Sequence, residues 1–198
     1  MKKEKNVMVK MKDGIKLATD IYFPQSENES LFPVLINRTP YNKDYMENSK
    51  EVNGYIEAGY VVVIQDVRGR YHSERVFIPY EYKVVDGLEL FEWVRRQSWC
   101  SGRFGTFGCS YHGGTQFLPA IKNPEGLTAM VPVVTFDDLY SGSAYNDGAK
   151  VLHDLRWTVA SIIPDIMESS KKSGQEIKVE PPEVYNCLEK IPLASDEA

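Results

Sequence analysis

The sequence predicts an α/β fold: a mostly parallel sheet with helices on both faces and an antiparallel hairpin at the N-terminus. Three observations lead to this prediction. Alternating apolar and polar residues flank an Asp13-Gly14 pair, which is a hairpin signal. The continuous β-branched run 60–65 suits a strand that is buried on both faces, as in parallel sheets. Strand and helix patterns alternate between residues 33 and 134, which is typical of parallel strands joined by crossover helices.

The expected elements follow one another in a regular order. The hairpin pairs strands within residues 7–9 and 16–23, and further strands are expected at 32–37, 60–65, 104–107 and 127–134. Helices are expected at 51–58, which Gly59 ends, at 81–97 and at 111–121. Beyond Val134 the alternation stops. Residues 147–163 predict one or two helices, the chain is polar from Glu168 onward, and no further strand is expected.

Composition and charge exclude several classes of function. The 198 residues carry 23 Lys and Arg against 28 Asp and Glu, a net charge of −5, which argues against nucleic-acid binding. No apolar run approaches the roughly 20 residues of a membrane span, and the charged N-terminus lacks the apolar stretch of a signal peptide. Three cysteines without metal-ligand spacing fit a reducing compartment, so we expect a cytoplasmic protein. No phosphate loop, dinucleotide fingerprint or metal-ligand pattern is present, and we expect no cofactor.

The sharpest motif surrounds Ser110, in the segment Gly108-Cys109-Ser110-Tyr111-His112-Gly113. Its spacing is G-x-S-x-x-G, one residue longer than the G-x-S-x-G of a nucleophile elbow, but a strand precedes it and a helix follows it, as an elbow requires. The glycines would leave room for a strained turn, and the helix N-terminus would offer N–H groups to an oxyanion. The residues alone equally allow an ordinary strand-to-helix turn with Ser110 as the N-cap.

Two neighbours of Ser110 could be mistaken for catalytic groups. Cys109 ends a strand, and we expect its side chain to point inward. His112 begins a helix, where the backbone would aim its ring away from the Ser110 hydroxyl. We therefore expect His112 to be a pocket or surface residue.

Four separated segments together resemble the family of acyl esterases and peptidases related to cocaine esterase, α-amino acid ester hydrolases and X-Pro dipeptidyl peptidases. They are residues 9–22, the segment Arg38-Thr39-Pro40-Tyr41, residues 59–74, and a discontinuous set of matches between 86 and 111. The resemblance covers about residues 7–165 and keeps the family's order. It implies an α/β-hydrolase domain with a helical cap inserted in it. We therefore expect residues 1–136 to be the N-terminal part of that domain, without its last strands, and residues 137–198 to be the start of the cap and a polar tail.

The resemblance also assigns roles to individual residues. It implies that Ser110 is the nucleophile and that the backbone N–H of Tyr111 and the phenol of Tyr41 bind the oxyanion. The residues alone would make Tyr41 a buried tyrosine that closes a loop after a strand. Arg68 is expected to have a structural role, pairing with nearby carboxylates. The implied substrate is a small-molecule ester or a short peptide, and the sequence does not separate the two.

A serine nucleophile needs an adjacent base, and that base needs an orienting carboxylate. Of the three histidines only His153 follows the elbow, and Asp137, Asp138 and Asp147 precede it. These residues could form a compressed triad, although a histidine in an amphipathic stretch more often packs or lies on a helix surface. We therefore expect the chain to be the N-terminal portion of a longer serine hydrolase, with little or no turnover by itself.

The expected partner is a second copy of the chain or a complementing C-terminal half. The rival hypothesis is a non-catalytic binding or assembly protein that keeps the hydrolase scaffold. That hypothesis explains the missing base without a longer chain.

Overall fold

The computed structural model describes residues 2–26, 31–164 and 167, and these contain a six-stranded sheet in the order β1-β2-β4-β3-β5-β6. β1 (Lys3–Lys10) and β2 (Lys16–Tyr22) form an antiparallel hairpin, and β2 runs antiparallel to β4 (Val61–Asp66). The other neighbours pair in parallel: β3 (Phe32–Thr39) lies between β4 and β5 (Cys100–Cys109), and β6 (Leu127–Val133) lies beside β5. The predicted fold class is confirmed.

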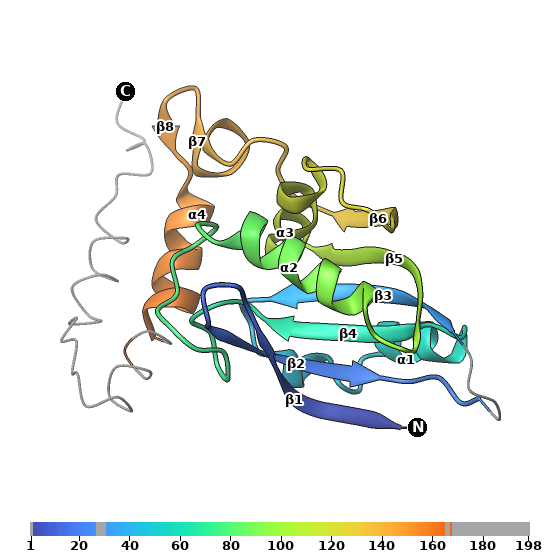
Figure 1. The fold of residues 1–198 in the computed structure, drawn as a ribbon. Coiled ribbons are helices and arrows are strands. Elements are labelled where there is room, and N and C mark those ends of the chain that lie inside the picture. The colour runs from blue at the N-terminus through green and yellow to red at the C-terminus, as the bar shows by residue number, and fades with distance from the viewer. Residues whose placement is uncertain (1, 27–30, 165–166, 168–198) are drawn as a thin grey trace, which may run out of the picture. The chain divides into compact units, whose positions relative to one another are not determined.

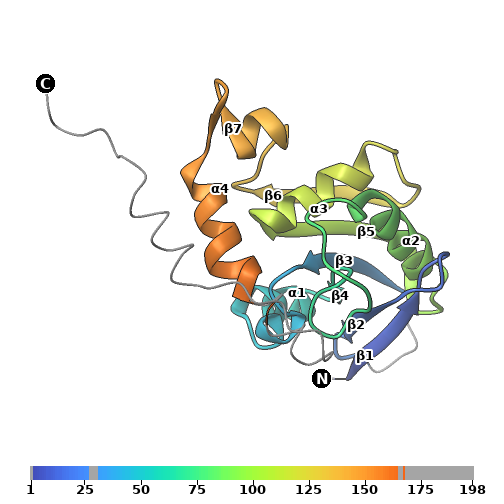
Figure 2. The ribbon, with the colours of Figure 1, turned by 90° about the vertical axis from the view of Figure 1, so that its left-hand side faces the viewer.

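Helices cover the two faces of this sheet, as Figures 1 and 2 show. Val52 and Ile56 of α1 (Lys50–Glu57) pack on one face, in a cluster that includes Phe107. α2 (Lys83–Arg95) packs on the other face, and α3 (Tyr111–Ala120) lies beside it. All six residues of β4 are buried, which explains the unbroken apolar run in its sequence. Each fully buried aliphatic side chain stabilises the folded state by about 1.5–3 kcal/mol, so the burial of both faces of the sheet contributes strongly to stability.

Two strands begin earlier than the sequence predicted. β5 begins at Cys100 rather than at residue 104, because Cys100 pairs with Phe32 at the start of β3. The first strand of the hairpin extends back to Lys3, which pairs with Tyr22. In both cases a polar or glycine-containing stretch becomes a strand because a neighbouring strand offers it hydrogen-bond partners.

The contacts divide the chain into two compact units, Met1–Asp137 and Asp138–Ala198. In the second unit, η2 (Tyr140–Ala144) leads to a short hairpin of β7 (Tyr145–Asn146) and β8 (Ala149–Lys150). α4 (Leu152–Trp157) and η3 (Thr158–Ile162) follow. The expected polar tail from Glu168 onward lies outside the described residues.

The prediction of helix from residue 147 was wrong over residues 147–150, where the chain turns in the hairpin. The φ angles of Asp147 and Gly148 are 48° and 86°, which is the pattern of a type I′ turn. In the part of the chain that the structure describes, no helix is both long enough and apolar enough to cross a bilayer.

Candidate active site

Ser110 lies in a sharp turn between the end of β5 and the start of α3. Its φ and ψ are 59° and −120°, and its side chain is exposed. A residue other than glycine is strained at a positive φ and persists there only where its surroundings hold it. Here the Ser110 N–H donates to the carbonyl of Val133 (2.9 Å), and the Ser110 carbonyl accepts from the Thr135 hydroxyl (2.9 Å). The turn therefore has the geometry of a nucleophile elbow at the carboxyl ends of the parallel strands.

The glycines of the motif allow the close packing of this turn. Gly108 has a φ of 136°, and a Cβ there would lie 2.5 Å from Cβ of His112. A Cβ at Gly113 would lie 2.4 Å from Cβ of Thr135, and one at Gly114 would lie 2.5 Å from Cζ of Phe136. On the helix side of Ser110, the close approaches thus fall on positions 113 and 114. Position 112 carries a side chain instead, which explains why the motif is one residue longer than the usual elbow.

This packing predicts that Gly113→Ala destabilises the protein by about 1–3 kcal/mol, because the added methyl group overlaps Thr135. Gly54→Ala is the matched control. Gly54 lies in α1, and a Cβ there would have no atom within 4 Å. The control should be neutral or stabilising by up to about 1 kcal/mol, through helix propensity alone. Urea unfolding of both variants measures the difference, and a Gly113→Ala protein as stable as the control would contradict the packing argument.

Tyr111 is anchored by its side chain and begins α3 with its backbone. Its ring is buried and stacks on Tyr80, with 4.2 Å between the ring centroids. Its phenol oxygen accepts the N–H of Tyr80 at 3.1 Å, and burial raises the pKa of this phenol well above the usual value. The side chain therefore fixes the residue in place. The backbone N–H lies at the N-terminus of α3, the part of a helix that binds anions.

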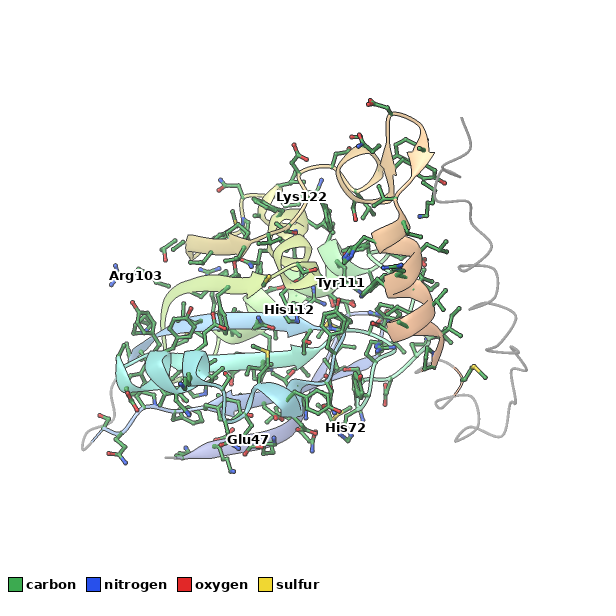
Figure 3. All side chains as sticks on the ribbon, turned by 180° about the vertical axis from the view of Figure 1, so that it is seen from behind. Glu47, His72, Arg103, Tyr111, His112 and Lys122 are labelled. Atoms are coloured by element: carbon green, nitrogen blue, oxygen red, sulfur yellow. The ribbon has the colours of Figure 1, made fainter. Side chains whose placement is uncertain are left out.

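Tyr41 follows β3, whose carboxyl end lies beside that of β5. Its ring packs edge-on against the rings of Tyr111 and His112, at centroid distances of 6.3 and 5.5 Å. Figure 3 labels Tyr111 and His112 at this edge of the sheet. The structure thus brings together the three residues that the sequence singled out, Ser110, Tyr111 and Tyr41.

The loop that carries Tyr41 is fastened to the sheet at several points. Buried Arg70 donates from Nε to the carbonyl of Pro40 (2.7 Å), and the N–H of Lys43 donates to Oδ1 of Asp66 at the end of β4 (2.8 Å). Nζ of Lys43, which is fully buried, forms an ion pair with Asp20 of β2 at 3.2 Å. Burial raises the pKa of Asp66 to about 6. The loop that carries Tyr41 is therefore held by groups from β2, β4 and the turn after β4.

Arg68 joins this turn to α2 and to the first hairpin. Its Nη2 lies 2.6 Å from Oδ1 of buried Asp86, and its Nη1 lies 2.6 Å from Oδ2 of Asp13. The hydrogen bonds to Asp86 are the main reason that the pKa of Arg68 is raised. The predicted structural role of Arg68, pairing with nearby carboxylates, is confirmed.

Lys83, the first residue of α2, is a buried lysine beside the site, and its amine has no hydrogen-bond acceptor. None of its surface is exposed, and its Nζ has no hydrogen-bond partner. The nitrogen lies over the rings of Phe77 and Tyr111, at 5.1 and 5.8 Å from their centroids. Burial, together with the neighbouring positive charge of Arg38, lowers the pKa of Lys83 to about 7.

The other candidate groups near Ser110 lie as follows. Cys109 is exposed, so the expectation of an inward side chain was wrong. Side chains alternate along a strand, so Cys109 shares the face of Phe107, but only Phe107 belongs to the cluster that α1 covers. Nε2 of His112 lies 2.9 Å from the hydroxyl of Thr39, and burial lowers the pKa of this ring to about 4. His112 is therefore a half-buried, neutral ring that bonds to Thr39.

The remaining histidines have other surroundings. Nε2 of His72 lies 3.5 Å from Oδ2 of Asp44. Figure 3 shows that His72 lies apart from His112. His153 is an exposed residue of α4, and Asp138 accepts hydrogen bonds from Ser141. The compressed triad stays a prediction. Among the described residues, no group of three or more His, Cys, Asp or Glu side chains could hold a metal ion.

Sequence reasoning missed Tyr80 and Lys83. Tyr80 lies in the irregular stretch between β4 and α2, where no periodic pattern marks it. Lys83 did carry a signal. It lies on the same helical face as Gly87, Leu90 and Val94, all of which are buried, so its position indicated a buried lysine.

Comparisons with known proteins show which family and which structures the chain is similar to. The profile of the X-Pro dipeptidyl-peptidase (S15) family matches residues 13–191. Cocaine esterase from Rhodococcus sp. (strain MB1 Bresler) is 40% identical over 147 residues, which is 72% of this chain and 25% of that protein. The crystal structure of a CocE/NonD family hydrolase from Staphylococcus aureus superposes with a TM-score of 0.73 at 27% identity, over 98% of this chain and 37% of that one. An α-amino acid ester hydrolase gives a TM-score of 0.68 at 28% identity, over 82% of this chain and 30% of that one. The chain thus spans between a quarter and just over a third of the length of these relatives.

Proposed function

The chain belongs to the X-Pro dipeptidyl-peptidase (S15) family of hydrolases, and from this premise we propose that it carries the nucleophile and oxyanion hole of a serine hydrolase. The observation that carries the proposal is the strained turn at Ser110, which presents an exposed hydroxyl between β5 and the N-terminus of α3. The substrates are acyl compounds, either esters or short peptides cut after an X-Pro unit.

The proposed reaction proceeds through an acyl-enzyme. Oγ of Ser110 attacks the carbonyl carbon of the substrate, the carbonyl oxygen takes the electron pair, and a base takes the hydroxyl proton. The Tyr111 N–H and the Tyr41 phenol donate to the resulting oxyanion. When the intermediate collapses, the alcohol or amine leaves with a proton and the acyl group stays on Ser110. Water then hydrolyses this ester and restores the serine.

The base and its carboxylate partner are proposed to lie outside residues 1–198. Two observations support this part of the proposal. Nε2 of His112 bonds to Thr39, and His72 lies beside Asp44, so neither is arranged to accept a proton from Ser110. The relatives that the chain matches are longer, because the matched part of this chain covers only 25% of cocaine esterase and 37% of the Staphylococcus aureus hydrolase.

A fluorophosphonate probe, which reacts with activated serines, tests the proposal. The probe is applied to the longest product of the gene, purified from its source, and the labelled peptide is identified by mass spectrometry. We expect the label on Ser110, none in Ser110→Ala, and full labelling in Cys109→Ala. Labelling of Cys109, or an unmodified Ser110 peptide in a folded protein, would favour a non-catalytic scaffold. Strong labelling of the 198-residue chain by itself would place the base within it, with His153 the candidate.

A further inference from the structure

The side chain of His112 connects the turn at Ser110 with the loop that carries Tyr41. On one side its Nε2 is 2.9 Å from the hydroxyl of Thr39, and on the other its Cβ packs where Gly108 leaves room. Its ring also meets the ring of Tyr41 edge-on, at 5.5 Å. One side chain from the first turn of α3 thus contacts both the elbow and the loop that follows β3.

The hydroxyl of Thr39 continues this connection to the backbone of Tyr41. Thr39 is 1% exposed, and its Oγ1 accepts the N–H of Tyr41 at 3.0 Å. The His112 ring is neutral at ordinary pH, so its Nε2 can accept the proton of the Thr39 hydroxyl, which leaves neither polar group unsatisfied. Two hydrogen bonds thus follow one another: the Tyr41 N–H donates to the Thr39 hydroxyl, and the Thr39 hydroxyl donates to the His112 ring. All three residues are buried or half-buried.

We propose that His112 is a positioning residue that holds the Tyr41 phenol at a fixed position relative to Ser110. It acts through the Thr39 hydroxyl and through its ring contact with Tyr41. This inference rests on the proposed function, in which Tyr41 is an oxyanion donor. It adds a role for His112 that differs from base or nucleophile. Because a misplacement of about 1 Å at a catalytic donor can cost about 100-fold in rate, a rigid support for Tyr41 has a measurable effect.

A double-mutant cycle on ester hydrolysis tests the coupling, in the longest product of the gene and with a p-nitrophenyl ester. Tyr41→Phe removes the donor and should lower kcat by about 100-fold. His112→Leu keeps an apolar contact but loses the bond to Thr39, and we expect kcat to fall about 10-fold with little change in KM. In the Tyr41→Phe background, His112→Leu should lower kcat by less than about 2-fold, because the phenol that His112 positions is already absent. Equal losses in both backgrounds would overturn the proposal.

Matched substitutions at Thr39 separate the hydrogen bond from packing. Thr39→Ser keeps the hydroxyl and should retain the wild-type kcat within about 2-fold, whereas Thr39→Val keeps the shape and should match the loss in His112→Leu. His112→Gln, which can still reach Thr39 with a polar atom, should restore most of the activity. If Thr39→Val were as active as Thr39→Ser, the hydroxyl would have no positioning role.

A measurement that does not depend on catalysis distinguishes the positioning role of His112 from the proposed function of Ser110. The 198-residue chain is labelled with 3-fluorotyrosine, and the ¹⁹F resonance of Tyr41 is assigned from its loss in Tyr41→Phe. We expect one sharp resonance in the wild type and in Thr39→Ser, and a shifted or split one in His112→Leu and Thr39→Val. An unchanged resonance in both would overturn the positioning role even if Ser110 is the nucleophile. Moved resonances with no effect of Ser110→Ala on hydrolysis would instead overturn the proposed function.

Discussion

Ser110→Ala is expected to lower kcat/KM for ester hydrolysis by about 10⁴- to 10⁶-fold, because the proposed acyl-enzyme route depends on its hydroxyl. The change removes one exposed oxygen, and the hydrogen bonds that hold the turn come from the backbone of Ser110 and from Thr135. The variant should therefore fold normally, which circular dichroism and urea unfolding can check. The activity is measured with a p-nitrophenyl ester on the longest product of the gene.

Cys109→Ala is the matched control for this prediction. The thiol of Cys109 is exposed and adjacent to Ser110, so it is the nearest rival nucleophile. We expect this variant to keep its activity within about 3-fold, as for a surface change that leaves the machinery intact. If activity disappeared in Cys109→Ala and survived in Ser110→Ala, the roles of the two residues would be reversed.

Lys83→Met is expected to raise the free energy of unfolding at pH 7 by roughly 3–5 kcal/mol. The ammonium group is fully buried without an acceptor, and burial lowers its pKa from 10.5 to about 7. At about 1.4 kcal/mol for each tenfold change in proton affinity, this difference corresponds to roughly 5 kcal/mol of destabilisation. The favourable contact of the cation with the rings of Phe77 and Tyr111 is lost in the variant, which reduces the gain.

The lowered pKa of Lys83 makes the free energy of unfolding depend on pH. Below about pH 7 the lysine is charged in both the folded and the unfolded chain, so the full cost of burial is present. Between about pH 7 and 10.5 the unfolded chain binds the extra proton, so the wild type becomes more stable as the pH rises. Urea unfolding from pH 7 to pH 10 should therefore show a rise in the wild type that is weaker in Lys83→Met.

Lys122→Met is the matched control, because Lys122 is exposed and its variant should differ from the wild type by less than about 0.5 kcal/mol. A Lys83→Met protein that is less stable than the wild type, with an unchanged pH slope, would contradict the assignment of Lys83 as a buried, destabilising amine. Such an amine beneath Tyr111 is consistent with the tendency of functional sites to hold groups that lower stability.

Local patterns were sufficient to predict most of the fold. The run 60–65 became a strand covered on both faces, and Asp13-Gly14 turned the first hairpin, where Gly14 has a φ of 89°. The second Asp-Gly pair, Asp147-Gly148, was missed because its strands have only two residues each, too short to show alternation. The start of β5 was also missed, since Cys100 becomes part of a strand only through its partner Phe32.

The candidate site was predictable in part, for a physical reason. Ser110 and Tyr111 lie in one local motif, so the sequence shows them together. The contacts of Tyr41 and Thr39 with His112 arise because β3 lies beside β5 in the sheet, although some 70 residues separate them in sequence. No local pattern encodes that neighbourhood. The bond between Thr39 and His112 and the stacking of Tyr80 on Tyr111 therefore emerged only from the structure.

The measurement that tests the central claim most directly is trapping of the acyl-enzyme. The longest product of the gene is mixed with p-nitrophenyl acetate, quenched in acid within the first turnovers, digested and analysed by mass spectrometry. We expect one acetyl group on Ser110, absent in Ser110→Ala and retained in Cys109→Ala. Release of p-nitrophenol with no acetyl group on Ser110, or with the acetyl group on Cys109, would contradict the central claim.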